Sequence, residues 1–155
     1  MGGPACYNRP MTAVSMSPSL RAAWWLHRHL YRLSGGRIGR HVNGFEILLL
    51  TTTGRQSGQP RVAALQTLPH DGGWAVAASH AGSDREPAWW LNLQARPEAD
   101  VQVGSSHRRV LARAASGSER DELWARFVAI DAAYDEYQRR TERPIAVVVL
   151  ERTGT

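Results

Sequence analysis

The chain has 155 residues, 43% of them hydrophobic, which is enough for one domain with a buried core. Its 19 basic residues are all arginine and outnumber the 14 acidic ones, so the net charge is +5. The absence of lysine excludes Schiff-base chemistry and a lysine-containing phosphate loop. The single cysteine, Cys6, excludes an intramolecular disulfide and a cysteine-ligated metal centre. The charge favours anionic partners, which the planar guanidinium group binds well.

The first 36 residues divide into two predicted segments. Residues 1–16 show no secretory pattern and are predicted to be a disordered leader. Ser17-Pro18 predicts the start of a helix, which ends near Gly35-Gly36 and so spans 17–36. Its apolar positions and the arginines on its other face are typical of an amphipathic helix on an anionic membrane. Packing of the same helix on the rest of the protein explains this pattern equally well.

The remaining residues, 37–155, are predicted to form one domain built mainly from short strands. Six β-type runs separated by turn residues indicate an antiparallel barrel or sandwich. They are Phe45–Thr53, Val62–Leu68, Trp74–Ser79, Asp100–Val103, Arg108–Ala115 and Ile145–Leu150. The turn His70–Gly73 has the composition of a hairpin. We therefore predict an α+β fold, a split β-barrel with three helices.

Two of these helices fall within the barrel domain. Pro87–Ala95 is predicted to be a short inserted helix, because proline suits its first turn and Arg96-Pro97 ends it. A longer helix is expected to begin at Ser118, with a capping hydroxyl from Ser116 or Ser118. Its apolar spacing is expected to continue to Tyr134 and Tyr137 and to carry them to the end of the barrel.

The loop between the first two predicted strands, Gly54–Arg61, is the most informative segment. It holds Arg55, Ser57, Arg61 and two glycines, although a tight turn would suffice to connect the strands. Arginine side chains and closely approaching backbone N–H groups are how proteins bind anions. A solvated hairpin loop is the alternative interpretation, and the residues alone do not choose between the two.

A second polar loop, Ser79–Glu86, leads into the predicted inserted helix. There, Trp89, Trp90 and Asn92 offer a flat wall and a hydrogen-bonding edge for a planar ring. Adjacent helical residues point about 100° apart, so one of the two indoles is expected to lie in the core.

Metal-dependent and hydrolytic chemistry find little support in the sequence. His27 and His29 face different sides of a helix, and no histidine pair has metal-ligand spacing. The nucleophile elbow and the dinucleotide-binding glycine pattern are both missing. The arginines are scattered and not striped with aromatic residues, which argues against nucleic-acid binding.

Several separated motifs, in order, resemble those of the deazaflavin-dependent nitroreductases and quinone reductases of actinobacteria, which use coenzyme F420. The resemblance covers about Arg40 to Glu151. It rests on LLTTTGRQSGQPR at Leu49–Arg61, Ala78-Ser79, Pro87–Leu93, Asp100–Val103 and Tyr134–Thr141. It implies a barrel of the flavin-reductase kind, with the cofactor in a groove and its charged tail held by loops.

The resemblance also implies roles for individual residues. Tail-binding positions would be Arg55, Gln56, Ser57, Gly58 and Arg61. Groove-lining positions would be Val62, Ala63, Ala64, Leu65, Gln66, Ala77, Ala78, Ser79 and His80. The cofactor site would be completed by Ala88, Trp89, Trp90, Leu91, Asn92 and Tyr134. Tyr134, Tyr137 or Ser79 would hydrogen-bond to the acceptor oxygen. No metal is implied.

Two positions depart from the family pattern. His80 stands where the family usually has lysine, and its charge depends on pH near neutrality. Asp131 stands where better-studied quinone reductases carry a tyrosine one turn before Tyr134, which leaves the aromatic wall incomplete.

The implied reaction is hydride transfer from the reduced deazaflavin to a quinone, a nitroaromatic compound or a similar acceptor. Two alternatives are a protein that binds or carries F420 without turnover and a reductase that uses flavin mononucleotide (FMN). We expect a cytoplasmic enzyme and hypothesise peripheral contact with the inner face of the membrane through the helix at 17–36. The sequence does not indicate the acceptor or the oligomeric state.

Overall fold

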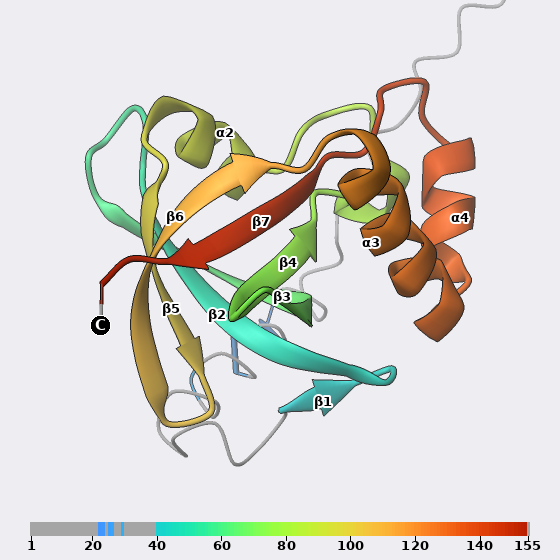
Figure 1. The fold of residues 1–155 in the computed structure, drawn as a ribbon. Coiled ribbons are helices and arrows are strands. Elements are labelled where there is room, and N and C mark those ends of the chain that lie inside the picture. Colours follow the sequence, from blue (N-terminus) through green and yellow to red (C-terminus); the bar gives the residue numbers. More distant parts are fainter. Residues whose placement is uncertain (1–21, 24, 27–28, 30–39, 155) are drawn as a thin grey trace, which may run out of the picture.

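A closed antiparallel β-barrel forms the body of the protein (Figure 1). The computed structural model describes residues 22–23, 25–26, 29 and 40–154. Its strands are β1 (His41–Val42), β2 (Phe45–Thr53), β3 (Pro60–His70), β4 (Gly73–Ala77), β5 (Glu98–Val103), β6 (Ser106–Ala114) and β7 (Val147–Arg152). Their order is β1-β2-β3-β4-β7-β6-β5, and pairing of β2 with β5 closes the barrel. The predicted barrel and its six strands are confirmed, with some strand ends shifted by a few residues.

The alternation of side chains along β2 decides what lies inside the barrel. Leu48 and Leu50 are fully buried in the inner core, where they join Trp74 and Val76. Ile47 and Leu49 belong to a separate cluster, as expected for side chains on the opposite face of the strand. All four are buried, so the hydrophobic run has an inner and an outer apolar face.

Two tight hairpins connect neighbouring strands. Asp71 (φ 44°) and Gly72 (φ 76°) link β3 to β4, and Asn43 (φ 52°) and Gly44 (φ 82°) link β1 to β2. Left-handed pairs of this kind match the twist of the strands they join. The hairpin predicted at His70–Gly73 is confirmed. β1 was not predicted, because two residues are too few for a recognisable alternation.

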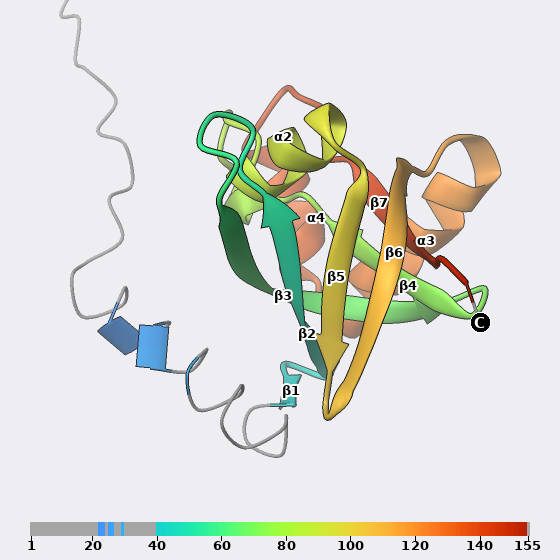
Figure 2. The same cartoon turned by 90° about the vertical axis from the view of Figure 1, so that its left-hand side faces the viewer.

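The helices are α2 (Ala88–Ala95), α3 (Gly117–Ile130) and α4 (Ala133–Arg139), and a short 3-10 turn, η1, spans His80–Gly82. α2 covers one end of the barrel, and α3 and α4 lie outside the strands (Figures 1 and 2). The inserted helix is therefore confirmed. Ser116 is the residue immediately before α3, but its hydroxyl makes no capping hydrogen bond.

The prediction that one continuous helix carries Tyr134 and Tyr137 was wrong. α3 ends at Ile130, and both tyrosines lie on α4. Asp131 is the reason, since its extended backbone interrupts the helix and its Oδ1 accepts the N–H of Ala133 at 2.9 Å. The Asp131 carboxylate favours the start of a new helix, and the spacing of apolar residues does not reveal the break between α3 and α4.

Five residues before Arg40 are described by the structure. The leader at 1–16 lies outside the described residues. Of the helix expected at 17–36, five residues are described, and all five are helical and exposed: Ala22, Ala23, Trp25, Leu26 and His29. Among described residues, no helix is long and apolar enough to cross a membrane.

Candidate functional site

The β2–β3 loop folds on itself. The N–H of Gly54 donates to the Gln59 carbonyl, and the N–H of Gly58 donates to the Gly54 carbonyl, both at 2.8 Å. Ser57 Oγ accepts the N–H of Gln59 at 3.2 Å and Nη2 of Arg61 at 3.4 Å. The predicted tail-binding side chains are therefore presented on an ordered loop.

A buried asparagine ties this loop to α2. Asn92 is 3% exposed, and its Oδ1 accepts the backbone N–H of Arg55 at 3.2 Å and Nη1 of Arg55 at 3.1 Å. Its Nδ2 donates to Thr52 Oγ1 at 3.0 Å. The amide predicted to face a ligand thus binds protein groups at both ends, and its role here is to fix the position of Arg55.

Both loop arginines are exposed and keep donors for a ligand. In the described part of the chain, the side chains of Arg55 and Arg61 hydrogen-bond only to the neutral groups of Asn92 and Ser57. Each guanidinium has five N–H donors, so most remain unused. Neither cation forms an ion pair with a carboxylate among residues 40–154, and two such cations a few residues apart suit a phosphate or carboxylate ligand.

The candidate site continues from the loop along β3. Side chains on this strand alternate between the inner and outer faces of the barrel, so the five predicted groove residues do not all lie on one face. Gln66 and Ala64 pair with Ile47 and Leu49 and therefore share their outer face, as does Val62. Ala63 pairs with Leu50, and Leu65 packs on the inner cluster. Only Val62, Ala64 and Gln66 present side chains on the outer face, since a strand cannot expose consecutive residues on one side.

The outer face of β4 continues this surface. Ala77 packs against a second outer cluster, which contains Leu123 and Phe127 of α3 and Tyr134 of α4. Ala78, by contrast, is fully buried in the inner core. Its backbone is engaged as well, because the N–H donates to the Ala146 carbonyl at 2.8 Å and the carbonyl accepts from Arg143 at 3.2 Å. Ser79 is half-buried and His80 is exposed, both beyond the end of the strand.

The aromatic end of the site is centred on Tyr134. The Tyr134 hydroxyl donates to Gln66 Oε1 at 2.6 Å, while its ring packs against Phe45 and Phe127. Burial raises the pKa of the Tyr134 phenol far above its usual range. The Tyr137 ring lies 5.7 Å from that of Tyr134 and is half-buried. Tyr134 is already committed to Gln66, whereas Tyr137 is more accessible.

The two indoles of α2 separate as predicted. Trp90 is 7% exposed within the barrel core, and Trp89 is half-buried at its edge. Their rings are tilted by 56°. Ala88 is exposed and Leu91 half-buried, so these two residues and Trp89 form the accessible side of the helix.

Arg143 organises the second loop, and sequence reasoning missed it. Its guanidinium donates to the carbonyl oxygens of Ala78, Ser79 and Ser83 at 2.8 to 3.2 Å. It also forms an ion pair with Glu86 at 3.2 Å. No local signal marks an arginine that acts on a loop some sixty residues earlier.

Comparisons with known proteins identify the family of this chain. The sequence profile of the F420H(2)-dependent quinone reductase family matches residues 11–152. The chain belongs to this family. An F420H(2)-dependent quinone reductase of Mycobacterium tuberculosis H37Rv is 40% identical over 132 residues, which cover 82% of this chain and 88% of that protein.

A solved structure gives the same assignment. The structure of an F420-H2 dependent reductase is 37% identical, with a TM-score of 0.62, and the match covers 68% of this chain and 93% of that one. A second structure, described as a domain-swapped dimer, is 31% identical with a TM-score of 0.64 and covers 84% and 99% of the two chains. The protein is therefore an F420-dependent oxidoreductase, and the FMN alternative is not needed.

Asp131 and His80, the two positions expected to depart from the family pattern, have visible structural roles in this reductase. Asp131 lies at the start of α4, where its side chain accepts the N–H of Ala133, so its role here is structural. His80 adopts a left-handed conformation (φ 45°), and its Nδ1 lies 3.2 Å from the carbonyl oxygen of Arg85. Its side chain is exposed beside the site.

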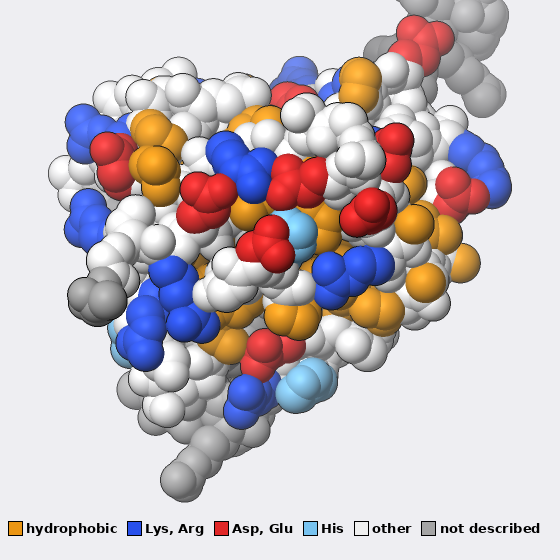
Figure 3. Space-filling model, in the orientation of Figure 1, with side chains coloured by type: hydrophobic (Ala, Val, Ile, Leu, Met, Phe, Trp, Pro, Cys, Tyr) orange, Lys and Arg blue, Asp and Glu red, His pale blue; other side chains and the backbone are white. Residues whose placement is uncertain are grey.

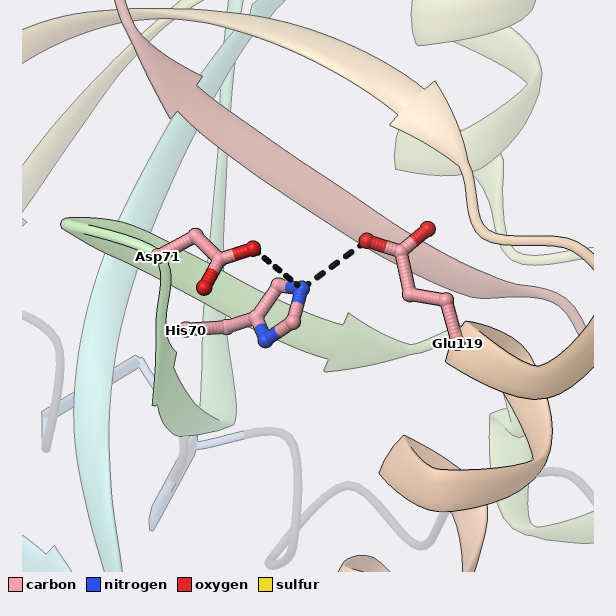
Figure 4. Close-up of side chains that lie close together, drawn as sticks. All are labelled: His70, Asp71 and Glu119. Atoms are coloured by element: carbon pink, nitrogen blue, oxygen red, sulfur yellow. Dashed lines mark hydrogen bonds and ion pairs between the residues drawn. The ribbon is translucent and has the colours of Figure 1, made fainter.

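A cluster of charged side chains lies at the far end of β3. His70 Nε2 is 2.9 Å from Glu119 Oε1 and 3.5 Å from Asp71 Oδ2 (Figure 4). Arg113 binds both oxygens of Glu119, at 2.7 and 2.8 Å, and Glu151 at 2.6 Å. Acidic and basic side chains are interspersed over this face of the molecule (Figure 3). Because Arg113 neutralises Glu119, we interpret the cluster as an ion-pair network that joins strands to α3.

Proposed function

We propose that the protein transfers a hydride from reduced coenzyme F420 to a quinone along the outer face of β3. The loop 54–61, with Arg55 and Arg61, would hold the anionic tail of the cofactor. The deazaflavin ring would lie near Gln66, Ala77 and the tyrosines of α4. The observation that carries this proposal is the pair of exposed arginines, anchored by Asn92 and Ser57, at one end of a surface that ends in aromatic residues.

The dimensions and chemistry of this surface fit an elongated cofactor. At about 3.3 Å per residue, Arg61 and Gln66 lie about 17 Å apart along the strand. Ala64 and Ala77 on the outer face have small side chains, which allow a planar ring to approach the sheet. The unused arginine donors match phosphate and carboxylate groups.

When bound, the reduced deazaflavin supplies the hydride. The protein's own groups would position the reactants and stabilise the charge that develops on the acceptor oxygen. Tyr137 and Ser79 are the candidate donors to that oxygen. Tyr134 is better suited to positioning, because its hydroxyl already donates to Gln66.

Binding measurements test the cofactor site. Titration with oxidised F420, followed by tryptophan fluorescence, is expected to show binding that Arg55→Gln or Arg61→Gln weakens about tenfold or more, the magnitude of a charged hydrogen bond. Arg126→Gln, which removes an exposed arginine of α3, is the control. Unchanged affinity in both loop variants would reject the tail site, and tighter binding of FMN than of F420 would reject the ring assignment.

We also propose that the helical segment around Trp25 and Leu26 makes peripheral contact with anionic membranes, where lipophilic quinones reside. Trp25 and Leu26 are 56% and 52% exposed, unusually high for large apolar residues. Co-sedimentation with phosphatidylglycerol vesicles is expected for the intact protein and should be lost in Trp25→Ser/Leu26→Ser. Leu111→Ser, at a strand residue that is 40% exposed, is the matched control. Equal sedimentation of all three proteins would refute membrane contact through the helix.

A further inference from the structure

Arg143 lies between α4 and β7, with its side chain 13% exposed, and binds one short segment at several points. Nε donates to the Ser83 carbonyl at 2.8 Å, and Nη1 and Nη2 both donate to the Ala78 carbonyl at 3.2 Å. Nη2 also donates to the Ser79 carbonyl at 3.0 Å. Glu86 balances its charge through Nη1. One guanidinium therefore fixes both ends of the loop that follows β4.

These bonds set the direction of two successive peptide units. In a trans peptide, the carbonyl and the N–H point in opposite directions. Because Arg143 binds the carbonyls of Ala78 and Ser79, the N–H groups of Ser79 and His80 point away from the guanidinium. The orientation of Ser79, a candidate donor to the acceptor, thus depends on Arg143, whose guanidinium binds this loop and Glu86.

The segment held in this way is conformationally strained. His80 and Ala81 have φ angles of 45° and 53°, in the left-handed region that residues with a Cβ avoid. Gly82 follows at 78° and packs tightly on α4, since a Cβ there would lie 2.7 Å from the Tyr137 carbonyl oxygen. Such a turn persists only where its surroundings hold it. Arg143 holds it on one side, and the helix that carries Tyr137 holds it on the other.

We propose that Arg143 is a positioning residue for hydride transfer, which holds Ser79–Gly82 in this strained turn against the helix that carries Tyr137. The proposal rests on the proposed function, because it needs Ser79 and Tyr137 at the acceptor end of the site. Arg143 itself would touch neither the cofactor nor the acceptor. Its effect would therefore fall on the rate of the reaction more than on the binding of F420.

The test compares Arg143→Lys with the wild-type protein, using reduced F420 and menadione, a naphthoquinone. Lysine keeps the charge but cannot bind several carbonyls with one planar group. We expect kcat to fall between about tenfold and about a hundredfold, with the Kd for F420 changed by less than about threefold. Arg113→Gln, which loses several hydrogen bonds far from the site, controls for lost stability and is expected to keep kcat.

A double-mutant cycle separates positioning from a general structural effect. If Arg143 acts through Ser79, the effects of Arg143→Lys and Ser79→Ala on kcat are less than additive. Additive effects, or a folded Arg143→Lys protein with wild-type kcat, would overturn the proposal. If Arg143→Lys does not fold, Glu86→Gln decides, because loss of the carboxylate that holds Nη1 should also lower kcat, and a wild-type kcat would overturn the proposal. None of these results touches the F420 site, which the Arg55 and Arg61 variants test.

Discussion

At the scale of single residues, three polar side chains hold the parts of the site together. Asn92 joins α2 to the loop of Arg55, Tyr134 joins α4 to Gln66 of β3, and Arg143 joins the segment before β7 to the loop after β4. Each bond crosses between segments distant in the sequence. Buried polar groups of this kind fix a unique arrangement, because losing one partner leaves the other unsatisfied.

Asn92→Leu is expected to destabilise the protein by about 1–3 kcal/mol and to weaken F420 binding. Leucine has a similar volume but leaves Thr52 Oγ1 and the N–H of Arg55 without their partner. Urea unfolding and F420 titration measure the two effects. Gln94→Leu, at an exposed position of the same helix, is the control. Wild-type affinity in a folded Asn92→Leu protein would show that the loop needs no tether.

Two neighbouring glycines of one hairpin are required for different reasons. A Cβ on Gly73 would lie 2.2 Å from the Leu150 carbonyl oxygen, whereas Gly72 has open space but a φ of 76°. Gly72→Ala is expected to cost about 1–2 kcal/mol in backbone strain. Gly73→Ala should cost more, because β4 and β7 must move apart. Urea unfolding compares the two variants, and an equal or smaller loss for Gly73→Ala would mean that the strands separate easily.

At the scale of secondary-structure elements, the charged cluster connects four of them. Glu119 at the start of α3 binds Arg113 of β6 and His70 at the end of β3, and Arg113 also reaches Glu151 of β7. α3 thus contacts the barrel through charges at its N-terminal end and through Leu123 and Phe127 along its length. The acidic position also suits the positive end of the helix dipole.

The cluster predicts a pH dependence of stability. The hydrogen bond from Arg113, and to a smaller extent the one from His70, lowers the pKa of Glu119 from 4.5 to about 2. Because the pKa of this carboxyl is lower in the folded state than in the unfolded state, its ionisation stabilises the folded protein at pH values above the unfolded-state pKa. This contribution is lost as the pH falls toward the folded-state pKa. The stability difference between wild type and Glu119→Gln should therefore shrink from about pH 5 to about pH 2.

Urea unfolding at a series of pH values measures this difference. Glu122→Gln, an exposed carboxylate on the same helix, should show no comparable change. A gap between wild type and Glu119→Gln that stays constant over the range would contradict the assigned ion pairs.

At the scale of the whole molecule, barrel closure brings the parts of the site to one surface. Pairing of β2 with both β3 and β5 fixes the loop at 54–59 beside α2. The antiparallel partner of β3, β4, brings the loop after Ala77 back toward the same end. A net charge of +5 adds a long-range attraction for an anionic cofactor.

F420 binding is therefore expected to weaken as salt rises. Between about 20 mM and about 500 mM NaCl the Debye length falls from about 20 Å to about 4 Å, which screens the loop arginines. The Kd should rise steeply for wild type and Arg126→Gln and less steeply for Arg55→Gln. Fluorescence titration at several salt concentrations gives these slopes. A Kd independent of salt would show that charge contributes little to cofactor binding.

Local sequence patterns were sufficient for most of the fold. The run Phe45–Thr53 was predicted with the observed bounds, because an apolar stretch bounded by turn residues has few alternatives. The break at Asp131 was missed, since the apolar spacing continues through it while a single side-chain bond ends one helix and starts the next. Hydrophobic periodicity reports burial, not helix continuity.

The sequence by itself determined the barrel class, the concentration of arginine and glycine in the loop at 54–61 and the resemblance to the F420-dependent reductases, because these depend on short motifs and local periodicity. The tertiary structure decided which residues lie on the outer face of β3, where we propose that the cofactor binds. Strand alternation turned Ala63, Leu65 and Ala78 away, and side-chain contacts committed Asn92 and Tyr134 to protein partners. It alone revealed Arg143, because its partners are carbonyl oxygens, which every residue carries and no sequence pattern distinguishes.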